Sequence, residues 1–195
     1  MIEYKKYILL RGEKALFAQS TQKRYKYTMN ETMNVAKEAA IAIEHYLNNL
    51  PETVNTINVE DDPLYQKKDI DLLYFFKNQH KVKKRTSIEI KGDRHYYTGN
   101  YFFETHSNVQ KNTPGCFMYT EADFLFYYYI NEKELHILPM KETRAWFLAH
   151  MHEFKTRGTS TQIGFQNKKG YRTSGKLVPR NYLLKSVPSA RVVQL

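Results

Sequence analysis

The spacing of apolar residues predicts one long amphipathic helix in the first quarter of the chain. The apolar residues that recur at helical spacing are Met33, Ala36, Ala40, Ile43, Leu47 and Leu50. Thr28 and Glu31 have the spacing of a capping box, and Pro51 would end the helix. The sequence therefore predicts a helix from about Thr28 to Asn48.

Shorter apolar runs, separated by polar turns, predict that most of the remaining chain is β-structure. The predicted strands are 56–59, 68–76, 83–91, 101–105, 122–130 and 134–139. Asn78-Gln79-His80 would join the second and third as a hairpin. The last two form either another hairpin or a short helix entering a strand. With a second helix expected over 141–154, this order predicts an α/β (α+β) fold, a sheet flanked by helices.

Composition narrows the class of protein. A chain of 195 residues with 42% apolar residues suits one domain with a real core. Its single cysteine, Cys116, excludes an intramolecular disulfide or a multi-cysteine zinc site and is expected to be a small core residue. No apolar run approaches the roughly 18–20 residues of a membrane span, and the N-terminus lacks a signal-peptide pattern. We expect a cytoplasmic protein, or one of viral origin in a host cytoplasm, without a membrane partner.

The net charge of +10 is concentrated at the C-terminal end. Residues 155–195 contain no Asp or Glu, and their basic residues are Lys155, Arg157, Lys168, Lys169, Arg172, Lys176, Arg180, Lys185 and Arg191. Aromatic and glycine residues interleave these charges, which favours nucleic-acid binding over a solvated tail. We therefore expect 155–195 to be a basic nucleic-acid-binding extension of the domain formed by 1–154, with the first seven of these residues gripping phosphates.

Acidic residues on the first predicted hairpin suggest a metal site. If its turn centres near His80, Asp71 lies opposite Glu89, with Cβ atoms about 4.5–5.5 Å apart. Glu89 and Lys91 share a strand face because side chains alternate. Two carboxylates this close repel each other unless a cation lies between them, and such ligands suit Mg²⁺, with Mn²⁺ as a substitute. Asp69 shares the face of Asp71 and is a rival first ligand.

This combination would support phosphodiester hydrolysis. A bound metal lowers the pKa of a water and offsets charge in the transition state. Lys91 could orient the nucleophile, act as a base or stabilise developing charge, and the sequence does not choose among these roles. The alternative is that Glu89 and Lys91 are ordinary residues of an exposed strand face.

Asp71 followed by Glu89-Ile90-Lys91, after a helix and across a hairpin, resembles the PD-(D/E)XK nuclease superfamily over roughly residues 28–130. Ile70 stands where that motif usually has proline. The resemblance implies a restriction-endonuclease-like central mixed β-sheet flanked by helices. It also implies Asp71 and Glu89 as metal ligands, a contribution from the Ile90 carbonyl, and Lys91 as the catalytic lysine.

Four further residues are candidates for the same site. Many such nucleases add a helical acid, and Glu44, at the edge of the apolar face, could supply a metal ligand or be an ordinary boundary glutamate. Glu104 lies between aromatic residues, where burial without a partner is costly, so it is either exposed at an edge or lies beside the metal site without binding the metal directly. Ser107 and Asn108 could contact phosphate.

Together these patterns predict a magnesium-dependent endonuclease that cuts DNA. Cutting both strands needs two sites, so a homodimer would suit it, although the sequence does not show one. A non-catalytic DNA-binding protein would explain the charge but leave the arrangement of Asp71, Glu89 and Lys91 to chance. An RNA-processing nuclease is the other alternative.

Overall fold

The computed structural model describes residues 29–161 and 171–195. The expected N-cap, Thr28, lies outside them. Helix α2 (Met29–Asn48) confirms the predicted helix, but its buried face is shifted from the predicted one. Met33 is 49% exposed, whereas Ala39, Ile43 and Leu47 are buried. Residues four apart lie on the same side of a helix, so Ala39 rather than Ala40 shares a face with Ile43. Leu47, four residues after Ile43, continues this face.

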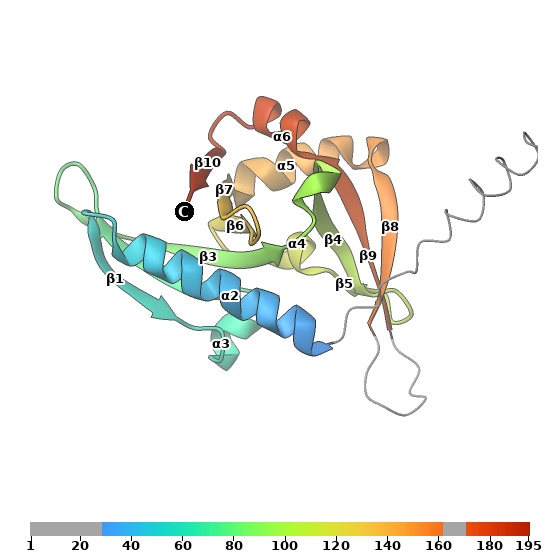
Figure 1. The fold of residues 1–195 in the computed structure, drawn as a ribbon, viewed down its shortest axis with the longest axis horizontal. Helices are drawn as coiled ribbons and strands as arrows, with labels where there is room; N and C mark the ends of the chain where they lie inside the picture. The colour runs from blue at the N-terminus through green and yellow to red at the C-terminus, as the bar shows by residue number, and fades with distance from the viewer. Residues whose placement is uncertain (1–28, 162–170) are drawn as a thin grey trace, which may run out of the picture.

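The central sheet is mixed and flanked by helices, as expected (Figure 1). In sheet order its strands are β1 (Thr53–Asn58), β2 (Leu72–Lys77), β3 (Lys83–Asp93), β6 (Phe124–Tyr129), β7 (Glu134–Pro139) and β10 (Arg191–Gln194). Strands β3 and β6 are parallel, and all other neighbours are antiparallel. Leu72 pairs with Ile88 and Lys77 with Lys83, which confirms the expected hairpin register. Strands β6 and β7 form a hairpin, so the alternative of a helix there is wrong.

A second, four-stranded sheet was not foreseen. Its order is β5 (Thr113–Pro114), β4 (Asn100–Asn108), β9 (Tyr171–Pro179) and β8 (Lys155–Thr161). The strand predicted at 101–105 therefore belongs to this sheet rather than to the central one. The basic C-terminal region enters both sheets, because β9 pairs with β4 and β10 pairs with β7.

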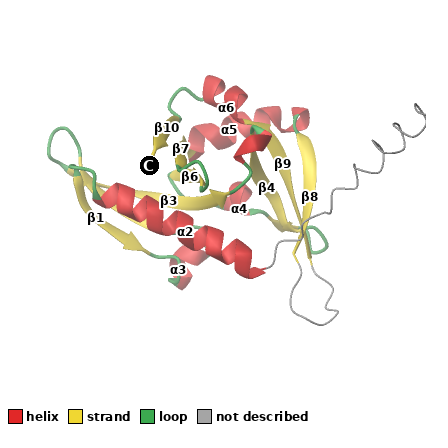
Figure 2. Cartoon of the chain, viewed as in Figure 1, coloured by secondary structure: helices red, strands yellow, loops and turns green. Residues whose placement is uncertain are grey.

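Short helices complete the structure (Figure 2). They are α3 (Pro63–Gln66), η1 (Tyr96–Thr98), α4 (Cys116–Tyr119), α5 (Met140–His150), η2 (Met151–Glu153) and α6 (Arg180–Ser186). The second predicted helix corresponds to α5 followed by η2. Within residues 29–161 and 171–195, no helix combines the length and apolar character needed to cross a membrane.

The two faces of the central sheet have different coverings. Helix α2 covers one face, where Ala39 and Ile43 pack with Ile88 of β3. The contact is close at Gly92, where a Cβ would lie 2.8 Å from the carbonyl oxygen of Val35. The second sheet and the helices α4, α5 and α6 cover the opposite face. Because side chains alternate along β3, Glu89 and Lys91 face this second layer.

Aromatic residues dominate the contact between the two sheets. Phe103 of β4 stacks on Phe117 of α4 at a centroid distance of 3.9 Å, and both rings are buried. Tyr101 meets Tyr127 of the central sheet edge to face. This packing holds β4 and α4 against the part of β3 that carries Glu89.

Candidate active site

Asp71 and Glu89 meet where the first hairpin joins the loop before β2. The backbone N–H of Asp71 donates to the carbonyl of Ile88 at 3.0 Å, which extends the hairpin pairing by one residue. The Asp71 carboxylate accepts a hydrogen bond from the backbone N–H of Ile90 at 2.8 Å. Glu89 is only 7% exposed. A backbone contact therefore fixes the Asp71 carboxyl group, and the register places the buried Glu89 opposite it.

The rival ligand, Asp69, also lies at this site. Its φ of +54° is in the left-handed region, which aspartate tolerates better than most residues. Thr120 Oγ1 donates to its carbonyl at 2.7 Å, and the hydroxyl of Tyr119 donates to Oδ1 at 3.3 Å. These contacts hold an unusual backbone conformation at the edge of the site.

Cys116 is the site residue that sequence reasoning missed. Ligand atoms of Asp69, Glu89 and Cys116 all lie within 4.8 Å of one another. Cys116 is half-buried at the start of α4, beside charged groups rather than within an apolar core. Burial raises the pKa of its thiol to about 12, so the thiol is neutral near pH 7. No sequence signal pointed to this position, because α4 reaches the site through the packing of β4.

The three carboxyl groups hold their protons more tightly than usual. Burial, and then the charges of Asp71 and Asp69, raise the pKa of Glu89 well above its ordinary value. Burial followed by the charge of Asp71 raises the pKa of Asp69 to about 6. Burial also raises the pKa of Asp71, although the N–H of Ile90 opposes this. Ionising all three together is costly unless a cation compensates them.

Lys91 supplies one positive charge to this cluster. Burial lowers its pKa, but nearby acids, among them Glu104, Glu89 and Asp93, outweigh burial and leave the pKa raised. Lys91 is therefore protonated at neutral pH. An ammonium is a hydrogen-bond donor without acceptor capacity, which favours orienting or charge-stabilising roles over that of a base.

Two carboxylate oxygens in the cluster lack a donor. Asp69 Oδ2 and Glu89 Oε2 are buried, and neither accepts a hydrogen bond within the described part of the chain. Buried polar atoms without a partner are uncommon in folded proteins and call for a ligand, water or ion. Carboxylate oxygens are the donors that Mg²⁺ and Mn²⁺ prefer, so these residues fit the expected metal.

Glu104 lies beside Lys91, on the second sheet. It is half-buried, and Glu104, Lys91 and Cys116 line a cavity of about 10 Å³, which has room for about one water molecule. Burial raises the pKa of Glu104, while Lys91 and the N–H of Cys116 lower it. Glu104 was expected either at an exposed edge or beside the metal site, and in the structure it lies beside the site.

Other expected site residues lie elsewhere. Glu44 belongs to α2, which packs on the Ile88 face of the central sheet, so the sheet separates it from Glu89 and the expected helical ligand is wrong. Ser107 Oγ donates to the carbonyl of Pro114 at 2.9 Å, and Asn108 Oδ1 accepts from the N–H of Lys111 at 3.0 Å. These two residues hold the turn between β4 and β5.

The basic C-terminal residues divide into two groups. Lys155, Arg157 and Arg172 are exposed, whereas Lys168 and Lys169 lie outside the described residues. Two others have partners within the fold. Lys176 Nζ donates to the carbonyl of Phe154 at 3.0 Å, and the Arg180 guanidinium lies over the ring of Tyr96, 3.6 Å from its centroid. Lys176 and Arg180 therefore contribute contacts to the fold, and both are half-buried, which leaves them less accessible to phosphate than the exposed residues.

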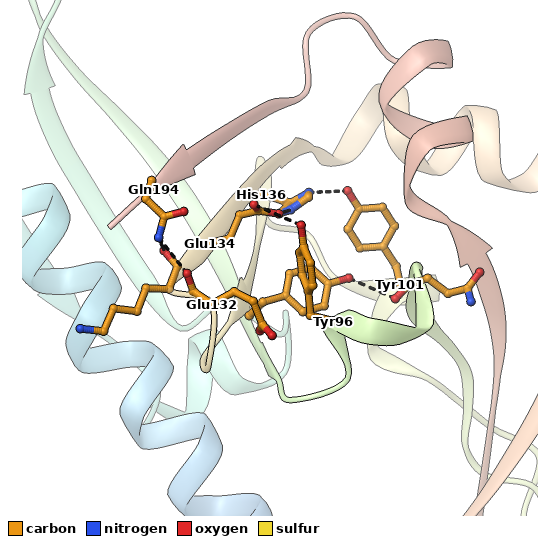
Figure 3. A network of polar contacts seen from close by, with 9 residues as sticks. Tyr96, Tyr101, Glu132, Glu134, His136 and Gln194 are labelled. Atoms are coloured by element: carbon orange, nitrogen blue, oxygen red, sulfur yellow. Dashed lines mark hydrogen bonds and ion pairs between the residues drawn. The ribbon is translucent and has the colours of Figure 1, made fainter.

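A polar network, drawn in Figure 3, lies on the face of the central sheet that carries Lys91, with β6 between His136 and β3. Tyr101 and His136 Nδ1 are hydrogen-bonded at 2.6 Å, and His136 Nε2 lies 2.7 Å from Glu134. Tyr96 also donates to Glu134, at 3.4 Å. Burial lowers the pKa of His136, so its neutral ring can donate to Glu134 and accept from Tyr101. The network joins β4 of the second sheet to β7 of the central one.

Comparison of the chain with family models, curated proteins and solved structures produced no match.

Proposed function

We propose that this protein is a magnesium-dependent endonuclease that hydrolyses phosphodiester bonds in DNA. The observation that carries the proposal is the cluster of Asp69, Asp71 and Glu89 beside Lys91, with two buried carboxylate oxygens that accept no hydrogen bond from residues 29–161 or 171–195. A cation would compensate the charges and satisfy both oxygens. Mn²⁺, which accepts the same ligands, is expected to replace Mg²⁺.

Asp71 and Glu89 would hold the metal. The N–H of Ile90 orients Asp71, and the close pairing of β2 with β3 places Glu89 opposite it. Asp69 is close enough to add an oxygen directly or through water. The carbonyl of Ile90 is a further candidate ligand, as the resemblance implies.

Bound at this site, the metal would generate a nucleophilic water and offset charge on the scissile phosphate. Lys91 would donate hydrogen bonds to a phosphate oxygen or to that water, and its positive charge would stabilise the transition state. Glu104 positions Lys91 from the second sheet. Both roles of Lys91 require its protonated form, which the surrounding acids favour.

The order of elements supports a restriction-endonuclease-like core as the finer fold. Helix α2 precedes an antiparallel meander of β1, β2 and β3, and β6 lies parallel to β3. The chain between β3 and β6 contributes β4 and β5 to the second sheet before reaching α4. Glu104 and Cys116 reach the site from this connection, so it would be a specific feature of this protein.

Cleavage of supercoiled, linear, single-stranded and branched DNA tests the proposal. We expect cutting with Mg²⁺ or Mn²⁺, none with EDTA, and none by Lys91→Ala, which should still bind DNA. Lys68→Ala is the matched control, because Lys68 forms an exposed ion pair with Glu121. Cutting that survives Lys91→Ala would place the chemistry elsewhere. Salt-sensitive binding without cutting would favour a DNA-binding protein, and cutting of RNA alone would favour RNA processing.

A further inference from the structure

The end of the β2–β3 hairpin is strongly basic. Residues 77–88 contain no Asp or Glu, and their basic residues are Lys77, Lys81, Lys83, Lys84 and Arg85. All five are exposed. In the described part of the chain, none of the five lies within ion-pair distance of an acidic group. This surface was not anticipated, because the excess charge of the C-terminal region dominates the sequence.

The sheet divides these charges between two faces. Tyr74 and Phe76 pack with α2, so the residues paired with them, Thr86 and Lys84, belong to the α2 face. Lys83 and Arg85 alternate with Lys84 and therefore belong to the opposite face. That opposite face is the one on which Glu89 and Lys91 lie.

On this face the pairs follow one another along β2 and β3 from the candidate active site to the hairpin end. After Asp71 and Glu89 come Leu73 with Ser87, Phe75 with Arg85, and Lys77 with Lys83. At about 3.4 Å per residue, Arg85 is about 14 Å and Lys83 about 20 Å from Glu89 along β3. These distances correspond to about four and six base pairs of duplex, each rising about 3.4 Å.

Over Leu73 this face is covered by Val59, Ile70 and Ala122, and the acidic group of Asp123, next to Ala122, has partners of its own. Asp123 Oδ2 accepts hydrogen bonds from the N–H and hydroxyl of Ser87, at 2.8 and 2.9 Å. Its charge is therefore directed at β3. Beyond Ser87, Arg85, Lys83 and Lys77 face solvent, with half-buried Phe75 beside them.

We propose that Lys77, Lys83 and Arg85 form a phosphate-binding strip that holds duplex DNA leading into the candidate active site. The duplex as partner rests on the proposed function, whereas the strip itself follows from its charge, exposure and alignment. Contacts from Lys and Arg to phosphate oxygens fix the position and orientation of a duplex and carry no sequence information, so the strip is expected to bind any duplex sequence. The strip fixes the direction of the duplex across the central sheet, parallel to β3.

Binding of a fluorescein-labelled 20-base-pair duplex, measured by anisotropy in EDTA, tests the strip without cleavage. The test variant is Lys83→Ala/Arg85→Ala. The matched control is Lys37→Ala/Lys84→Ala, which removes the same charge from exposed residues of α2 and the α2 face. Thermal unfolding of both variants checks that the fold is retained.

The logarithm of the binding constant falls linearly with the logarithm of the salt concentration. Each lost phosphate contact reduces the steepness of this line by about 0.9 and the affinity at 0.15 M salt by about fivefold. We therefore expect the test variant to lose on the order of 10- to 30-fold in affinity and about 2 from the slope, while the control changes little. Equal losses in the two variants, or none in the test variant, would overturn the proposal. The proposal would also be overturned if the test variant lost affinity for a duplex RNA of the same length but not for the DNA duplex. Failure of the nuclease proposal gives a different pattern, since the strip would still bind DNA that is never cut.

Discussion

Replacing Asp69 with asparagine measures how strongly the cluster needs a cation. Burial and the charge of Asp71 raise the pKa of Asp69 from 3.8 to about 6. A shift of about two units corresponds to about 3 kcal/mol, and solvent screening at this half-buried position reduces it to about 1–3 kcal/mol. Asparagine tolerates the left-handed backbone and can still accept from Tyr119, so the change removes mainly the charge.

The sign of the effect depends on pH. An acid whose pKa is raised in the folded state costs stability once it must ionise. In EDTA the wild-type protein should therefore lose this stability as pH rises from about 4 to about 6, and the loss should persist above pH 6. Asp69→Asn should avoid the loss and be more stable by about 1–3 kcal/mol at pH 7–8, with little difference at pH 4.

Urea unfolding in EDTA at pH 4, 5, 6, 7 and 8 measures the difference. Glu121→Gln is the control, because its exposed ion pair with Lys68 should change stability by less than about 1 kcal/mol. Repeating the series with Mg²⁺ should stabilise the wild type by about 2.7 kcal/mol at a hundredfold excess over Kd, and Asp69→Asn by less. A variant that is less stable than the wild type at pH 8 in EDTA would refute the reasoning.

Three other variants test the arrangement of the fold around the site. Gly92→Ala should destabilise the protein by about 1–3 kcal/mol in urea unfolding, because the new Cβ would lie 2.8 Å from the Val35 carbonyl oxygen; an unchanged midpoint would contradict the close packing of α2. Phe103→Ala should cost about 3–5 kcal/mol in the same assay, because this buried ring stacks on Phe117, and a cost below about 1 kcal/mol would contradict it. Glu44→Gln should leave metal-dependent cleavage unchanged, because α2 covers the other face of the sheet; lost cleavage would show that Glu44 reaches the site.

The sequence predicted the elements that depend on local pattern. The period of the apolar residues located α2, and the turn at Asn78-Gln79-His80 set the register that brings Asp71 opposite Glu89. Both features involve residues near one another in the chain. The prediction of which side of α2 is buried was wrong, because apolar residues such as Met33 also occur on the exposed side.

The second sheet could not be predicted in the same way. Strands β4 and β9 pair although about 70 residues separate Glu104 from Gly175, and no local pattern encodes such a pairing. Cys116 and Glu104 reach the site only through that packing. The partners of Lys176 and Arg180 depend on it too, so a count of basic residues overstated the charge available for phosphate.

Cleavage of supercoiled plasmid by wild type and Glu89→Gln, with Mg²⁺ and with EDTA, tests the central claim most directly. Glu89 is the most deeply buried of the three acids, and glutamine keeps its shape while removing its charge. We predict Mg²⁺-dependent nicking by the wild type, with none in EDTA and none by a folded Glu89→Gln variant. Nicking by Glu89→Gln at the wild-type rate would contradict the assignment of this cluster as the metal site.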